Sequence, residues 1–452
     1  MSTSSFQQAA SLETLPPEVL LPIVTSLPGL DNLWDLMRAS PHVWRLFNDH
    51  AVAIIEGILS GPNAILPPEI AELIRAVVLV RSRAIPFQSF DEFQGRFLRK
   101  VSRRWKGRYL EAPPRPFPDD KLSTGCLSAA SPSVAALRST VATTHQISAL
   151  SQACLTSFLD RLRDPGFRPQ HLADPEDRYD RFHRRGPNGE YIDAWDQVFK
   201  GTPVKVVDVG QPTWVEEMRV VRALWYIQIV GEMHHQAECL DWPADDIEGL
   251  KNMSPGDERH NLDIPYPLSP EEVRSVMGYL ETLGEVKQDA YYRLPPPPSC
   301  KRWATALPIR GEQYMEIAGH REDGSPIKRP KWTEDRLWGR TPVALDGDAP
   351  GLSIFKRLTK PPPHPVSASP LEGIKFDSFR PFGLAIWDKW RMYNLGLHCS
   401  ALPGQGCSPF DALYFFAWES ILPPDEVASV KSELRARKKK ESEELEDQRR
   451  QN

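Results

Sequence analysis

The sequence predicts a mainly α-helical protein, in which an N-terminal three-helix module precedes an irregular helical body with Pro-rich linkers and little strand. Apolar residues recur at helical spacing over long stretches, most clearly in residues 131–162 and 213–232. The 44 prolines must break many segments and create irregular connections. Residues 204–209, rich in valine, are the best strand candidate, and that strand is short.

The N-terminal module is expected to contain three short helices. The first begins at Pro16 or Pro17, because proline loses nothing at a position whose N–H is unpaired anyway. Pro22 lies inside this helix and is expected to kink it. Asp31 is a suitable N-cap for the second helix, and Ser40 for the third.

Two further helical patterns follow, over residues 51–59 and 68–80. Residues 66–70 repeat the Leu-Pro-Pro-Glu-aliphatic sequence of residues 15–19. A duplicated module would explain the repeat, and so would a plain helix that starts at a proline. We favour the second explanation because the patterns downstream of the two copies do not repeat.

Two capping boxes mark helix starts in the body. Thr213 is followed after three residues by Glu216, and Ser269 by Glu272, so each pair is expected to satisfy free N–H groups at a helix start. Gly284 is a suitable C-cap for the second of these helices.

The chain is expected to divide into six consecutive parts. They are a disordered leader (1–11), the three-helix module (12–60), a helical body (61–294), a Pro/Gly-rich linker or loosely ordered region (295–370), a C-terminal helical segment that packs on the body (371–423) and a charged helix or tail (424–452).

Charge and composition exclude several classes of protein. The net charge of -5 favours neither nucleic acid nor a membrane surface as a partner. No stretch approaches the roughly 20 apolar residues of a membrane span. Residues 1–10 are small and polar, so we expect no secretory signal, and the six cysteines form no CxxC pair. A reducing cytoplasmic or nuclear location is the natural expectation.

The module carries a recognisable set of residues. Leu15, Pro16 and Glu18 form a Leu-Pro-x-Glu opening. The matches that follow it are Val19, Leu20, Ile23, Leu27 and Trp44. With these residues the stretch resembles an F-box, a three-helix module that binds the Skp-type adaptor of SCF ubiquitin ligases. Residues 213–232 and 380–388 also resemble segments of large F-box-like proteins of filamentous fungi, a group with no known activity.

The resemblance implies a function for the whole chain. The residues expected to touch the adaptor are Leu15, Pro16, Val19, Leu20 and Ile23. Leu27, Leu36 and Val43 are expected to hold the module together. The chain would be a substrate-receptor subunit that reaches a cullin scaffold through the adaptor and binds an unknown protein client through its helical body. It would carry out no chemistry and need no cofactor.

The alternative is a non-catalytic structural or interaction protein, in which the F-box-like helices merely cap the following body. The two hypotheses differ in one observable. A receptor leaves the adaptor-facing side of Leu15 and Pro16 exposed as an apolar patch, whereas a structural cap covers it with the chain's own residues. An enzyme, the third class, needs convergent polar groups in a pocket, and the sequence indicates none.

Other candidate sites have simpler explanations. His235 and Cys239 have a workable metal-ligand spacing on a helix next to His234, but further ligands are not identifiable, and we assign no metal. His398, Cys399 and Cys407 could also bind a metal, but they too lack further identifiable ligands. Glu216 and Glu217 resemble an acid/base pair, yet their place in a first helical turn explains them.

The tryptophans and the basic residues near the C-terminus each allow two interpretations. The tryptophans at helical spacing could line a groove, but we favour the core for them; they are Trp214, Trp225, Trp387 and Trp390. The basic residues 435–440 could be a nuclear localisation signal. The acidic run that follows favours a solvated helix with pairs such as Glu433–Arg437 instead.

Overall fold

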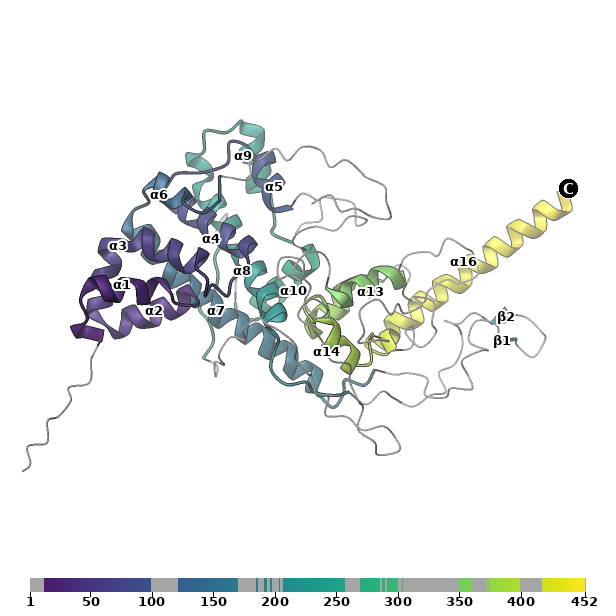
Figure 1. The fold of residues 1–452 in the computed structure, drawn as a ribbon. Helices are drawn as coiled ribbons and strands as arrows, with labels where there is room; N and C mark the ends of the chain where they lie inside the picture. The colour runs from purple at the N-terminus through teal and green to yellow at the C-terminus, as the bar shows by residue number, and fades with distance from the viewer. Residues whose placement is uncertain are drawn as a thin grey trace, which may run out of the picture. The chain divides into compact units, whose positions relative to one another are not determined.

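The structure is a computed structural model of the 452-residue chain. The residues that it describes are 12–98, 121–169, 184–185, 191–192, 196, 203, 206–256, 269–284, 287–288, 291–299, 303, 349–359, 371, 374–398 and 417–451. The fold is mainly α-helical, as predicted (Figure 1). The expected leader and most of the 295–370 region lie outside the described residues.

The chain forms two compact units, each assembled from segments far apart in the sequence. The first unit contains the described residues up to Cys154 and from Glu217 to residue 303. The second contains the described residues from Leu155 to Glu216 and from residue 349 onward.

The three-helix module opens the first unit. Its elements are η1 (Leu12–Thr14), α1 (Pro17–Thr25), α2 (Leu30–Ala39) and α3 (Pro41–Ser60). α3 contacts the other three elements. α1 continues through Pro22, so this proline does not end the helix. α2 begins at Leu30 with Gly29 as its N-cap, and the prediction of Asp31 as the cap was wrong.

α3 joins two helices that the sequence suggested were separate. Ser40 caps it as predicted, because its Oγ accepts the Val43 N–H at 3.2 Å. The helix then runs to Ser60 with one bend at His50, where φ is −130° and ψ is 25°. Residues 51–59 therefore extend the module's third helix into the body of the unit.

The body of the first unit surrounds two buried helices. α4 (Pro68–Arg81) is buried on nearly all sides, and so is α8 (Trp214–Gln236) from Glu217 onward. The remaining elements of this unit are α5 (Phe90–Leu98), α6 (Cys126–Ala130), α7 (Val134–Arg163) as far as Cys154, η4 (Ala237–Cys239), α9 (Ala244–Lys251), α10 (Pro270–Glu281), β3 (Lys287–Gln288) and β4 (Tyr291–Tyr292). β3 and β4 form a small antiparallel hairpin in which Lys287 pairs with Tyr292.

Ion pairs between helices hold this body together. Glu272 of α10 accepts from Arg219 Nη1 and Arg222 Nη2 of α8, each at 2.7 Å, and all three side chains are buried. Glu272 is therefore not the reciprocal half of a capping box with Ser269. Ser269 is the N-cap of α10 without a side-chain hydrogen bond, so the second predicted capping box was wrong. The carboxylate is used between helices because two buried arginines need a counter-charge.

Aromatic packing organises the second unit. Its elements are the end of α7, β1 (Arg184–Arg185), β2 (Tyr191–Ile192), the start of α8, α13 (Pro350–Thr359), η5 (Phe376–Phe382), α14 (Lys389–Asn394) and α16 (Pro424–Gln451). The rings of Phe355, Phe379 and Trp418 pack together, with Phe379 and Trp418 centroids 5.2 Å apart. Gly383 adopts φ +69°, and an added Cβ would come within 2.8 Å of the Phe158 ring. Only glycine fits this turn without strain.

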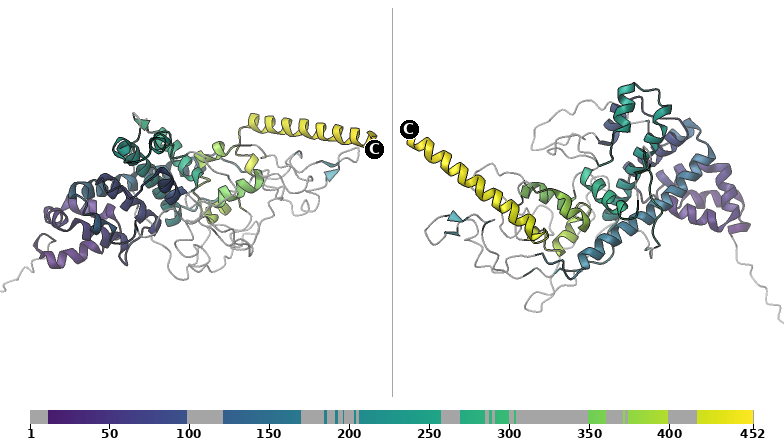
Figure 2. Two further views of the ribbon diagram at one scale, coloured as in Figure 1. Left: turned by 90° about the horizontal axis from the view of Figure 1, so that it is seen from above. Right: turned by 180° about the vertical axis from the view of Figure 1, so that it is seen from behind.

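The C-terminal residues form one long helix, α16, where the sequence left a charged helix and a tail as alternatives for 424–452 (Figure 2). Leu434 is buried, whereas most of the later residues are exposed. Ion pairs one turn apart, such as Lys440–Glu444 at 3.8 Å, lie along this part. A helix that is polar all round depends on such local pairs.

The predicted strand at residues 204–209 is not found. Its described part, residues 206–209, has no strand structure, and the Val207 N–H donates to Asn394 O at 3.1 Å. The two hairpins β1–β2 and β3–β4 are the strands of the described residues apart from an isolated bridge at Pro203. A run of valines thus became an irregular segment hydrogen-bonded to α14.

Glu272→Ala is expected to destabilise the protein strongly, because it removes the buried carboxylate that binds both Arg219 and Arg222. Removing one partner of a buried ion pair costs about 3–5 kcal/mol. The free energy of unfolding from denaturant titration measures the loss. Glu281→Ala, at an exposed position of the same helix, is the control and should change stability by less than about 0.5 kcal/mol. Equal effects of the two substitutions would contradict this role of Glu272.

Candidate functional site

An exposed row of apolar side chains runs along η1 and α1. We define the N-terminal apolar stripe as Leu12, Leu15, Pro16, Val19 and Ile23. Val19 is 47% exposed, Ile23 44% and Leu12 38%, and these are the most exposed large hydrophobic side chains of the described residues. Val19 and Ile23 are four residues apart, which places them on one face of α1. Clustered exposed aliphatic groups commonly mark a binding surface.

The five residues predicted to touch the adaptor differ in their exposure to solvent. Pro16, Val19 and Ile23 are exposed and Leu15 is partly exposed. Leu20 is fully buried inside the module, so its predicted role as a contact is corrected to one in packing. The residues expected to hold the module together differ in burial. Val43 is buried, and Leu27 and Leu36 are half-buried.

The repeated Leu-Pro-Pro-Glu sequence provides an internal comparison. α4 starts at Pro68 as a plain proline-started helix would, and Ile70 and Ile74 occupy the positions that correspond to Val19 and Ile23. Both isoleucines of α4 are fully buried. The same local sequence therefore gives a core helix in one place and an uncovered apolar face in the other.

Helix α7 covers a different side of the module. The Arg138 guanidinium lies 4.4 Å from the Trp44 ring centroid and donates to Asn48 Oδ1 at 2.6 Å. Ser148 Oγ donates to Asp31 Oδ2 at 3.5 Å. Trp44, the closing aromatic of the F-box pattern, thus anchors the module to the body.

The start of α3 holds the stripe's N-terminal end. Ser40 Oγ donates to a Glu13 carboxylate oxygen, and His42 Nε2 lies 3.0 Å from Leu15 O. Ser40 is buried, whereas η1 contains no buried residue.

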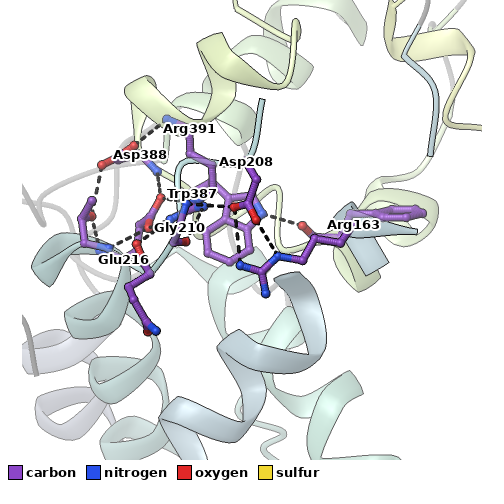
Figure 3. Close-up of polar contacts among 10 residues, drawn as sticks. Arg163, Asp208, Gly210, Glu216, Trp387, Asp388 and Arg391 are labelled. Carbon is purple, nitrogen blue, oxygen red and sulfur yellow. Dashed lines mark hydrogen bonds and ion pairs between the residues drawn. The ribbon is translucent and has the colours of Figure 1, made fainter. Parts of the chain in front are cut away.

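The second unit contains a buried polar cluster around Glu216 (Figure 3). Thr213 and Glu216 form the predicted capping box: the Thr213 N–H donates to Glu216 Oε2 at 2.9 Å and the Glu216 N–H to Thr213 Oγ1 at 3.4 Å. Arg391 of α14 binds the same carboxylate through Nε at 2.9 Å and Nη2 at 3.0 Å. This forked contact is the strongest geometry available to an arginine and a carboxylate.

Asp388 links the cluster to the start of α14. Its Oδ1 accepts the Arg391 N–H at 2.8 Å as an N-cap, and its Oδ2 accepts from Thr213 Oγ1 at 3.1 Å. Burial, and secondly the negative charge of Glu216, raise the pKa of Asp388 to about 7. Of these two buried carboxyl groups, Glu216 binds the guanidinium of Arg391 and Asp388 binds its backbone N–H.

An exposed ion pair extends the network. Arg163 Nε donates to Asp208 Oδ2 at 2.8 Å, and Asp208 Oδ1 accepts the Gly210 N–H at 2.8 Å (Figure 3). Hydrogen bonds from Arg163 and the Gly210 N–H hold the pKa of Asp208 below its usual range despite partial burial. Arg391 also donates to Gly210 O at 3.3 Å and Gln211 O at 3.0 Å. The cluster therefore fixes the irregular segment 206–213 against α14.

This cluster has a structural role, because it joins segments of the second unit through buried hydrogen bonds. Glu216, Asp388 and Arg391 are at most 8% exposed, and their polar atoms are hydrogen-bonded to one another. Sequence reasoning identified Glu216 and its cap but missed Asp388 and Arg391. Asp388 directly precedes a short helix, so an N-cap search could have found it, whereas the pairing of Arg391 depends on tertiary structure.

The His/Cys and tryptophan candidates from the sequence do not form a binding site among the described residues. Cys239 lies in η4 beyond the end of α8, so it does not share a helical face with His235, and His234 is buried. Among the described residues no three His, Cys, Asp or Glu side chains are placed to hold a metal ion. Trp214, Trp225 and Trp387 are core residues. Residues 399–416, with two of the cysteines, and the Trp390 side chain lie outside the described part.

None of the described helices combines the length and apolar character needed to cross a bilayer.

No protein-family model, curated protein or solved structure matches this chain.

Asp388→Asn is expected to remove a pH dependence of stability. The folded-state pKa of about 7 exceeds the unfolded value of 3.8, so the folded protein binds the extra proton between these values and loses stability as pH rises toward 7. Between pH 5 and 8 this group should cost the wild-type protein about 3 kcal/mol. Asparagine keeps the acceptor for the Arg391 N–H and cannot ionise. Denaturant titrations at both pH values should show the variant gaining stability relative to wild type at pH 8; parallel pH profiles would contradict the role of Asp388.

Proposed function

We propose that the chain binds a Skp-type adaptor through the N-terminal apolar stripe and acts as a substrate-receptor subunit of an SCF-type ubiquitin ligase. The observation that carries the proposal is the exposure of Val19 and Ile23 within an otherwise well-packed three-helix module. The residues lie directly after the Leu-Pro-x-Glu opening on which the F-box resemblance rests. In this function the helical body holds a protein client, and a cullin scaffold is reached through the adaptor.

Energetics support the stripe as a docking surface. Burying an aliphatic side chain stabilises a complex by about 1.5–3 kcal/mol. Leaving several uncovered in one row gains nothing for the isolated chain, and the matching positions Ile70 and Ile74 show that this local sequence is compatible with full burial. An adaptor with an apolar groove would cover the stripe by contacts that need shape and apolarity more than directed hydrogen bonds.

A structural role is the second candidate, and the α7 contacts favour it. Arg138 binds both Trp44 and Asn48, so the module's other side contributes to the body. Deleting residues 1–48 would remove these partners and should destabilise the remainder. This role accounts for the covered side of the module, but it does not account for the exposed stripe.

Val19→Asp and Ile23→Asp should each weaken adaptor binding by at least about tenfold, because each places an unpaired charge in the apolar contact. The full chain is co-expressed with a Skp-type adaptor, and the affinity of the purified proteins is measured by calorimetry. Circular dichroism and thermal unfolding should be nearly unchanged, since both side chains are already solvent-exposed.

Asn32→Asp is the control, because it adds the same charge at an exposed position of α2 outside the stripe. It should bind the adaptor like the wild-type chain. A wild-type chain that shows no affinity for the adaptor would overturn the proposed function and leave the structural role.

A further inference from the structure

We infer that Ser40 and Glu13 are positioning residues for the stripe: the hydrogen bond between them holds η1 on the start of α3 and sets Leu12 and Leu15 in line with Val19 and Ile23. The inference rests on the proposed adaptor binding and adds how the surface is presented.

The first step is that η1 contains no buried residue. This 3₁₀ turn nevertheless contacts α3. Three residues with one turn of helix cannot hold their own position by local hydrogen bonding. Polar contacts with α3 therefore contribute to the position of this end of the stripe.

The second step is that these contacts converge on two residues at the start of α3. Ser40 Oγ donates to the Glu13 carboxylate and accepts the Val43 N–H, so one buried hydroxyl serves both as helix cap and as clasp. His42 Nε2 makes a second contact, with Leu15 O at 3.0 Å. The clasp ties the position of η1 to the capped end of a 20-residue helix.

The third step is that fixing η1 before docking lowers the cost of binding. A loose segment must be ordered when the partner arrives, and this ordering is subtracted from the affinity. Leu12, which is 38% exposed, and Leu15 belong to the part of the stripe that the clasp controls. Val19 and Ile23 lie on α1, which has its own buried residues, Leu20 and Val24.

The chemistry of the clasp allows the two roles of Ser40 to be separated. Glu13→Ala removes the clasp and leaves the cap of α3 intact. Ser40→Asp keeps a good capping acceptor but sets two carboxylates against each other. Adding Glu13→Gln to Ser40→Asp restores an attraction, since the introduced amide can donate to the introduced carboxylate.

The test uses the full chain with these variants and two readouts. Adaptor affinity is measured by calorimetry, and hydrogen exchange follows the amides of residues 12–15. Glu13→Ala and Ser40→Asp should each bind about fivefold to tenfold more weakly and exchange faster at these amides. The Glu13→Gln/Ser40→Asp variant should recover most of both properties. If Ser40→Asp does not fold, Glu13→Ala decides alone, because Glu13 is an exposed residue.

The two readouts distinguish this inference from the proposed function. Wild-type affinity combined with unaltered exchange in Glu13→Ala would overturn the positioning role and leave adaptor binding untouched. A wild-type chain without adaptor affinity would overturn the proposed function, and hydrogen exchange would then still show whether the clasp holds η1. Tight binding by Ser40→Asp without the second substitution would also contradict the inference.

Discussion

The bidentate pair between Glu216 and Arg391 is the interaction on which the second unit depends. The carboxylate of Glu216 accepts N–H groups from Thr213 and Asp388, the residues that precede α8 and α14. One buried charge therefore satisfies the free backbone groups at two helix starts and balances a guanidinium that also binds the carbonyl groups of Gly210 and Gln211. A neutral side chain at position 216 could not perform these tasks together, because each needs a charged or multiple acceptor.

Much of the helical structure followed from local physics. Pro68, the Ser40 cap and the Thr213 capping box each predicted a helix start that the structure contains, since these signals depend on neighbouring backbone groups. The predictions failed where contacts with residues distant in the sequence intervened. Glu272 binds Arg219 and Arg222 and does not form the predicted capping box. The valine segment is irregular, and its Val207 N–H donates to Asn394 O of α14. Sequence spacing contains no information about which distant helix supplies an arginine.

The candidate docking site was predictable in part. The Leu-Pro-x-Glu opening drew attention to the segment that carries the exposed stripe, and helical spacing placed Val19 and Ile23 on one face. The burial of Leu20 depends on how α1 rotates against α3, which a consensus pattern does not specify. Nor could sequence alone distinguish residues 15–19 from residues 66–70, because exposure is decided by what packs over each helix. Two similar strings of residues thus have opposite environments.

The single bend at His50 has a mechanical consequence for the module. Before the bend α3 contributes Val43, Leu46 and Phe47 to the three-helix core; after it, Glu56 binds Arg75 of α4 through three hydrogen bonds. The two parts of α3 belong to different layers, with the bend at His50 between them. The angle of this bend would therefore set the direction in which a protein bound to the stripe faces relative to α4.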